Sequence, residues 1–183
     1  MKKLLQSLIV LLAASLCAAA QQQWTWQTFS PPDGAWSITA PGLMKPDLEA
    51  IEPESKKGSY SYNDFRGFFA VIYRDSPKRL VPWKPNYSAY FRKVRKEIVK
   101  AAKGELLRET EYTSGGISGR EAYVKIPVGT ITGPEGQTKT KYRIERFRMF
   151  FVDKRFYLLI AVVPESDADS PEVNNFFNSF AAR

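Results

Sequence analysis

Two stretches of the chain are apolar on both faces of a strand, and they constrain the architecture most. Residues 68–73 read FFAVIY, and residues 156–163 read FYLLIAVV. A strand with one face in water alternates apolar and polar residues, whereas a continuous apolar run needs cover on both faces. The chain therefore predicts a central sheet with other elements packed against each side.

Two amphipathic segments can provide that cover. Residues 86–103 carry apolar side chains at helical spacing, with Asn86 as a possible N-cap and Gly104 as the stop. The second segment is 170–180, where Ser170 can cap the helix and proline suits its first turn. Its apolar stripe consists of Val173, Phe176, Phe177 and Phe180. We expect a helix in each segment.

The other predicted elements are strands separated by turn-forming residues. Short turns join neighbouring strands in antiparallel pairs, and helices placed between and after them complete an α+β domain. We therefore expect a mainly antiparallel β-sheet flanked by helices on its faces. The strands are expected at 24–29, 36–40, 59–66, 68–75, 105–114, 117–128, 138–153 and 155–163, with turns at 31–34, 115–116, 133–136 and 153–154.

One predicted strand changes phase along its length. In residues 138–153, the apolar side chains occupy even positions up to Ile144 and odd positions from Phe147 onward. A β-bulge moves the buried face by one residue. The pattern therefore predicts a bulge near Glu145 and Arg146.

The first twenty residues have the three parts of a secretory signal: two lysines, an apolar stretch, and small residues that end at Ala20. Cleavage between Ala20 and Gln21 is expected, which leaves residues 21–183 as a single domain in the periplasm or outside the cell. Leu16 before Cys17 disfavours a lipoprotein anchor. No later segment is long and apolar enough to predict a membrane span.

Within that domain, two stretches rich in proline and polar residues read as connections rather than as domain boundaries. Residues 41–58 are expected to form a long surface loop, and residues 76–86 a linker into the first helix.

The chain contains no histidine, and Cys17 is its one cysteine. Ser-His-Asp, Cys-His and thiol redox chemistry are therefore excluded from the mature chain, and we expect no metal or other cofactor. General acid–base work is left to carboxylates, lysine and tyrosine. The carboxylates on or near predicted strands are Asp64, Glu121, Glu145 and Asp153. Their spacing places no two of them across a cleft, so we expect a protein that is not an enzyme. A carboxylate hydrolase remains the alternative.

The first predicted helix has a basic outer face, in a chain of formal net charge +8. Arg92, Lys96, Lys100 and Lys103 oppose its apolar stripe, together with Lys93 and Arg95. Such a face could hold an anionic partner: an envelope protein, an acidic polysaccharide or lipid headgroups. No nucleic acid is expected outside the cytoplasm. The plainer interpretation is a solvated helix face.

Tyrosine is abundant and offers a second kind of site, a cavity for a small apolar ligand. Strand and core packing explains the same residues, because tyrosine combines an apolar ring with a polar end. Both interpretations stay open. The candidates are Tyr60, Tyr62, Tyr73, Tyr87, Tyr90, Tyr123, Tyr142 and Tyr157.

The two ends of the domain resemble a known family. The segment WTWQTFSPPDGAWSITAPG at 24–42, and FYLLIAVVPE at 156–165 followed by SPEVNNFFNSF at 170–180, are similar to the opening and closing of secreted PsbP-like domains. The resemblance implies an antiparallel sheet between helices, the fold of the extrinsic photosystem II protein P and of a Ran-binding nuclear import factor. It also implies a binding or assembly module, with no catalytic or metal-binding residue to carry over.

Overall fold

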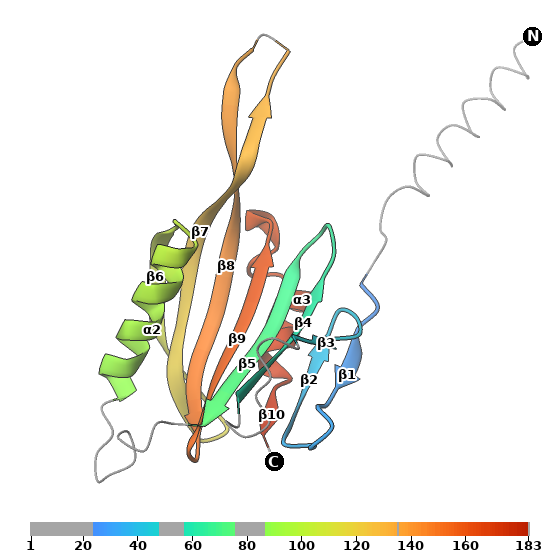
Figure 1. Cartoon of the computed structure of the whole chain (residues 1–183), viewed down its shortest axis with the longest axis vertical. Helices are drawn as coiled ribbons and strands as arrows, with labels where there is room; N and C mark the ends of the chain where they lie inside the picture. The colour runs from blue at the N-terminus through green and yellow to red at the C-terminus, as the bar shows by residue number, and fades with distance from the viewer. Residues whose placement is uncertain (1–23, 48–56, 76–86, 135, 183) are drawn as a thin grey trace, which may run out of the picture.

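Seven antiparallel strands form the main sheet, in the order β3-β4-β5-β9-β8-β7-β6 (Figure 1). The computed structural model describes residues 24–47, 57–75, 87–134 and 136–182. The strands are β3 (Lys45–Pro46), β4 (Lys57–Asn63), β5 (Phe68–Asp75), β6 (Glu105–Ser114), β7 (Ile117–Thr132), β8 (Thr138–Val152) and β9 (Arg155–Val163). The α+β class and the antiparallel sheet predicted from the sequence are confirmed.

The two continuous apolar segments lie side by side at the centre of this sheet. They are β5 and β9, which pair along their whole length, with Ala70 opposite Ile160 and Val71 opposite Leu159. Successive side chains of a strand point to opposite faces, so these strands contribute to two cores. Val71 and Leu159 belong to one core, whereas Ala70 and Ile160 belong to the other. The predicted need for cover on both faces is met.

Helix α2 (Tyr87–Ala101) covers one face. Phe91 and Val94 are its buried residues, and they join a cluster that includes Phe147 and Met149 of β8. The apolar stripe predicted for this helix is therefore its packing face. The helix ends two residues before the predicted end, and Gly104 closes it with a backbone hydrogen bond from its N–H to the carbonyl of Val99, 3.0 Å long.

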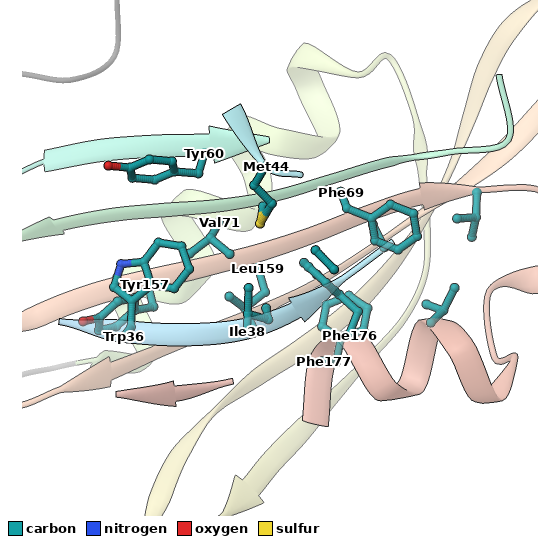
Figure 2. Close-up of a cluster of buried hydrophobic side chains, with 14 of the residues drawn as sticks. Trp36, Ile38, Met44, Tyr60, Phe69, Val71, Tyr157, Leu159, Phe176 and Phe177 are labelled. Carbon is teal, nitrogen blue, oxygen red and sulfur yellow. The ribbon is translucent and has the colours of Figure 1, made fainter. Parts of the chain in front are cut away.

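The opposite face is covered by helix α3 (Pro171–Asn178) and a small three-stranded sheet, ordered β1-β2-β10. Its strands are β1 (Gln27–Phe29), β2 (Trp36–Ala40) and β10 (Ala181–Ala182). In Figure 2, Trp36 and Ile38 of β2 and Phe176 and Phe177 of α3 pack toward Val71, Leu159 and Phe69 of the main sheet. The protein thus has α2 on one side of the sheet, and α3 with the small sheet on the other (Figure 1).

Local signals place this second layer. Gly34 adopts φ +64° in the turn between β1 and β2, and its N–H donates to the carbonyl of Pro31. Ser170 caps α3, since its hydroxyl accepts a hydrogen bond from the backbone N–H of Val173 at 3.2 Å. Phe180 was expected inside this helix, but the chain leaves the helix after Asn178. It then forms β10 against β2, with Ala181 opposite Ser37.

The β-bulge predicted near Glu145 and Arg146 is wrong. Both residues keep continuous register with β7 and β9, and the irregularity lies on β7, between Pro127 and Gly129. The phase change has another cause. Arg146 and Arg148 occupy two inward positions beneath α3, and both are buried despite their charge. The even-numbered positions of β8 therefore stay on the same buried face from Ile144 to Phe150. Two of them hold arginine where an alternating pattern predicts an apolar residue.

These arginines attach α3 to the sheet. Glu121 of β7 accepts hydrogen bonds from the Nε atoms of Arg146, at 3.0 Å, and Arg148, at 2.7 Å. Their other nitrogens reach α3: Arg146 donates to the side-chain oxygen of Asn174 and Arg148 to that of Asn178, both at 2.8 Å. A buried charge is tolerated only when paired and hydrogen-bonded, and this network satisfies both arginines.

Two further expectations concern the loops and turns. The segment 41–58 was expected to be a surface loop, but Gly42 and Met44 are buried, and Lys45 pairs with Ser61 as part of β3. This expectation is wrong for the buried residues and for the residues that form β3 and the start of β4, and residues 48–56 lie outside the described residues. The signal with its cleavage point at Ala20 and Gln21, and the linker at 76–86, lie outside the described residues.

The strands β7 and β8 extend past the rest of the sheet as a two-stranded arm (top of Figure 1).

Candidate functional site

The basic face predicted on α2 lines a groove along that helix. Arg92, Lys96 and Lys100 are exposed and line a groove of about 440 Å³, together with Ala89, Lys93 and Glu97. Lys103 is exposed but lies beyond the helix, in a turn with φ +49°, and does not line the groove. Three of the four predicted residues are therefore brought together.

The charges of this groove are predominantly positive. In the described part of the chain, its one ion pair joins Lys93 to Glu97 at 3.9 Å, with both side chains mostly exposed. Such a surface pair contributes little to stability. Arg95 was also expected on this face, but it is half-buried and pairs with Glu109 of β6. Arg92, Lys96 and Lys100 thus direct their charge to solvent.

The four carboxylates considered for catalysis do not come together. Glu121 lies on the face beneath α3 and is held by two arginines, whereas Glu145 lies on the opposite face, which α2 covers. Asp64 lies in the β4–β5 turn, and Asp153 in the β8–β9 turn at the other end of the sheet. Glycoside hydrolysis needs two carboxyl groups about 5–10 Å apart across one cleft, and these positions do not provide them.

Two of these carboxyl groups have shifted pKa values for different reasons. Burial raises the pKa of Glu145 to about 7. For Asp64, burial also raises the pKa, but hydrogen bonds from Arg66 and from the backbone N–H groups of Gly67 and Arg66 outweigh it and hold the pKa below its usual value. Asp64 is thus a stable anion, with Arg66 Nη2 2.6 Å from its Oδ2.

The tyrosines do not surround one cavity. Tyr60, Tyr73 and Tyr157 belong to the core beneath the small sheet, and Tyr87 and Tyr90, both residues of α2, pack against the core that this helix covers. The hydroxyl of Tyr123 donates to Asp169 at 2.6 Å, and burial followed by this hydrogen bond raises its pKa to about 12. None of the eight candidates lines the α2 groove or the cleft described next. Seven of the eight tyrosines pack in a hydrophobic core or form a hydrogen bond, so core and strand packing accounts for them. The eighth, Tyr142 of β8, is exposed.

A second cleft, of about 630 Å³, was not anticipated from the sequence. It lies where the residues before β1, the β4–β5 turn, β8 and the start of α3 meet. Its aromatic side chains are Trp24, Trp26 and Phe65, its cations Arg66, Lys141 and Arg143, and its acids Asp167 and Glu172; Pro164 and Ser170 complete the lining. The alternation of Trp24 and Trp26, which puts both on one side of an extended segment, was the only local signal for it.

The described residues contain neither a cluster of metal-ligating side chains nor a membrane-spanning helix. No three histidine, cysteine, aspartate or glutamate side chains gather there in a way that could hold a metal ion. No helix in those residues has the length and apolar character needed to cross a bilayer.

The fold has solved counterparts, although no protein-family model and no curated protein matches the sequence. The solution structure of cyanobacterial PsbP (CyanoP) from Synechocystis sp. PCC 6803 is similar, with a TM-score of 0.60 and 12% identity over 90% of this chain and 96% of that one. The crystal structure of the Saccharomyces cerevisiae Ran-binding protein Mog1p has a TM-score of 0.50 and 11% identity, over 87% of this chain and 96% of that one. The chain has the Mog1/PsbP-like fold.

This similarity confirms the architecture that the resemblance implied. At these identities it concerns the path of the backbone, and the Mog1/PsbP-like fold assigns no role to an individual side chain. The α2 groove and the cleft beside Trp24 are therefore the candidate binding sites of this chain.

Proposed function

We propose that this protein is an exported binding module without catalytic activity, and that it binds an anionic partner of the cell envelope through α2. The observation that carries the proposal is the groove on that helix. Arg92, Lys96 and Lys100 are aligned there at helical spacing, and the groove's one acid is already paired with Lys93. A surface of one sign attracts and orients a partner of the other.

Three further observations support this function. The first twenty residues have the composition of a secretory signal, which favours the periplasm or the exterior. The candidate carboxylates lie on different faces and at different ends of the sheet, which disfavours hydrolysis by a carboxylate pair. The fold is also that of a Ran-binding protein, so it can serve binding.

The test is recovery of a partner from an envelope extract by the immobilised protein. We expect the variant Arg92→Glu, Lys96→Glu, Lys100→Glu to lose most of the recovered material, because three attractive charges become repulsive. Recovery by the unaltered protein should also fall at about 1 M salt, where the Debye length is ~3 Å. Assays for protein, uronic acid and lipid phosphate would then assign the partner to a chemical class.

A matched variant separates the groove from the overall charge. Lys45→Glu, Lys139→Glu, Lys154→Glu changes the net charge by the same amount at three exposed positions that do not line the groove. It should recover the partner nearly as well as the unaltered protein. Undiminished recovery by the α2 variant, or an equal loss in the matched variant, would show that the groove is not the binding surface.

A further inference from the structure

The second cleft has the size and lining of a small-molecule site. Its volume of about 630 Å³ lies within the roughly 300–1,000 Å³ of typical ligand pockets, which combine apolar walls with a few polar groups. It is built from segments far apart in the sequence, and none of its residues lines the α2 groove. A ligand here would therefore occupy a site separate from the groove proposed for the α2 partner.

The aromatic wall is held in place by its own contacts. The indole N–H of Trp24 donates to Asp64 at 3.2 Å, and the guanidinium of Arg66, which pairs with the same carboxylate, lies 5.0 Å from the centre of the Trp24 ring. Trp26 meets Trp24 edge to face, with centroids 5.8 Å apart. Phe65 is 75% exposed, although its backbone carbonyl accepts a hydrogen bond from Arg143 at 2.7 Å. This wall is preorganised, with one apolar ring exposed at its edge.

The charged walls carry both signs and do not neutralise each other. Lys141 and Arg143 come from β8, whereas Asp167 and Glu172 come from the segment that leads into α3. Within the described part of the chain, none of these four residues forms an ion pair. Asp167 accepts a hydrogen bond from the Ser166 hydroxyl at 2.7 Å. Apart from Arg66, which pairs with Asp64, two cations and two acids thus line one cleft without forming ion pairs with each other.

This arrangement favours one class of ligand. A simple anion would be attracted by the cations but repelled by the acids, and a neutral apolar molecule would desolvate all four charges without replacing their hydrogen bonds. A ligand with an anion at one end, a cation at the other and an apolar group between them would satisfy every wall. Short peptides with free termini have these groups.

We propose that this cleft binds a short peptide with free termini and an apolar side chain. The terminal carboxylate binds Lys141 and Arg143, and the terminal ammonium binds Asp167 and Glu172. The apolar side chain packs against Trp26 and Phe65. Charge-assisted hydrogen bonds at both ends orient the peptide, and the aromatic wall selects its side chain.

The experiment is titration calorimetry of the purified protein with the tripeptide Ala-Phe-Ala in three forms. The probe with two free termini should bind with a Kd of about 1 mM or tighter. N-acetylation and C-amidation should each weaken binding by roughly fivefold or more, since each removes one charge-assisted contact. No heat with the free peptide at about 5 mM, or equal affinity for all three forms, would overturn the proposal.

Three variants assign the ends of the peptide. Lys141→Gln should weaken the free peptide and reduce the effect of C-amidation, and Glu172→Gln should do the same for N-acetylation. Phe65→Ala, at an exposed side chain, should weaken all three forms alike. Lys45→Gln, an exposed lysine of β3 outside the cleft, is the control and should change nothing. Unaltered ratios between the capped and free forms in both charge variants would show that these walls do not bind the termini.

Discussion

At the scale of the residue, Glu145 is a buried carboxyl group with no partner for its negative charge among the described residues. It is 9% exposed on the β8 face that also carries Phe147 and Met149, and its carboxyl group has no hydrogen bond or ion pair with another described residue. Burial alone raises its pKa from 4.5 to about 7. The folded protein therefore keeps this proton to a higher pH than the unfolded chain does.

The sign of the resulting pH dependence follows from linkage. Between about pH 4.5 and pH 7 the folded state binds more protons, so raising the pH favours unfolding. The stabilisation is present below pH 4.5 and is lost as the pH rises through about 7. A pKa change from 4.5 to about 7 corresponds to ~3 kcal/mol at ~1.4 kcal/mol per unit.

Glu145→Gln should abolish most of this loss, because the amide does not ionise. Urea unfolding at pH 5 and pH 8 would measure it, as a smaller difference in the free energy of unfolding between the two pH values than in the unaltered protein. Glu105→Gln, at an exposed carboxylate, is the control and should leave the difference unchanged. Equal pH dependence in Glu145→Gln and the unaltered protein would show that Glu145 ionises normally.

Buried charged residues of β8 also show what could not be predicted from the sequence. Arg146 and Arg148 look like solvent-facing residues, and contacts with distant residues, among them Glu121, Asn174 and Asn178, make their burial possible. Those partners come from β7, α3 and the residues just before α3, and no local sequence pattern predicts that they meet the arginines. A bulge was the simplest local explanation of the phase change, and it failed because a tertiary network could fill the inward positions with charge.

At the scale of the element, local chemistry predicted most boundaries. The turn at 31–34, the central strands β5 and β9, and the N-terminus of α3 all occur where side-chain patterns and turn residues placed them. The end of α3 and strand β3 did not, because each depends on pairing with a strand elsewhere in the chain. The cleft beside Trp24 was missed for the same reason: its walls come from four separate segments.

The cap of α3 gives the prediction at this scale. Ser170→Ala removes the acceptor for the backbone N–H of Val173 and should lower the free energy of unfolding by about 1 kcal/mol. Urea unfolding would measure this as a lower midpoint with an unchanged m-value. Ser170→Asp should retain stability, since aspartate is also a good cap, and Ser118→Ala, at an exposed serine of β7, serves as the control. Full stability in Ser170→Ala would show that the hydroxyl does not hold the helix.

At the scale of the whole molecule, one sheet separates two cores that share its strands. Residues on one face of β5, β8 and β9 pack beneath the small sheet and α3, and residues on the other face pack beneath α2. Helix α2 and strand β2 lie on opposite sides of the sheet, but each depends on the same central strands for its burial. Loss of either layer exposes an apolar face of those strands, so we expect the two layers to unfold together.

This coupling can be tested by perturbing one core and observing the other. Val94→Ala shortens a buried side chain of α2 and should destabilise the protein by on the order of 2 kcal/mol. The indole N–H signal of Trp36, a buried residue of β2, reports on the far core in NMR spectra recorded across a urea titration. Its midpoint should fall by the same amount as the midpoint from far-UV circular dichroism, whereas Lys45→Ala, at an exposed residue, should move neither. If the Trp36 signal kept its original midpoint while α2 melted earlier, the small sheet and α3 would be stable without α2. The basic groove and the peptide cleft would then belong to separately folding layers, and binding at one could not stabilise the other.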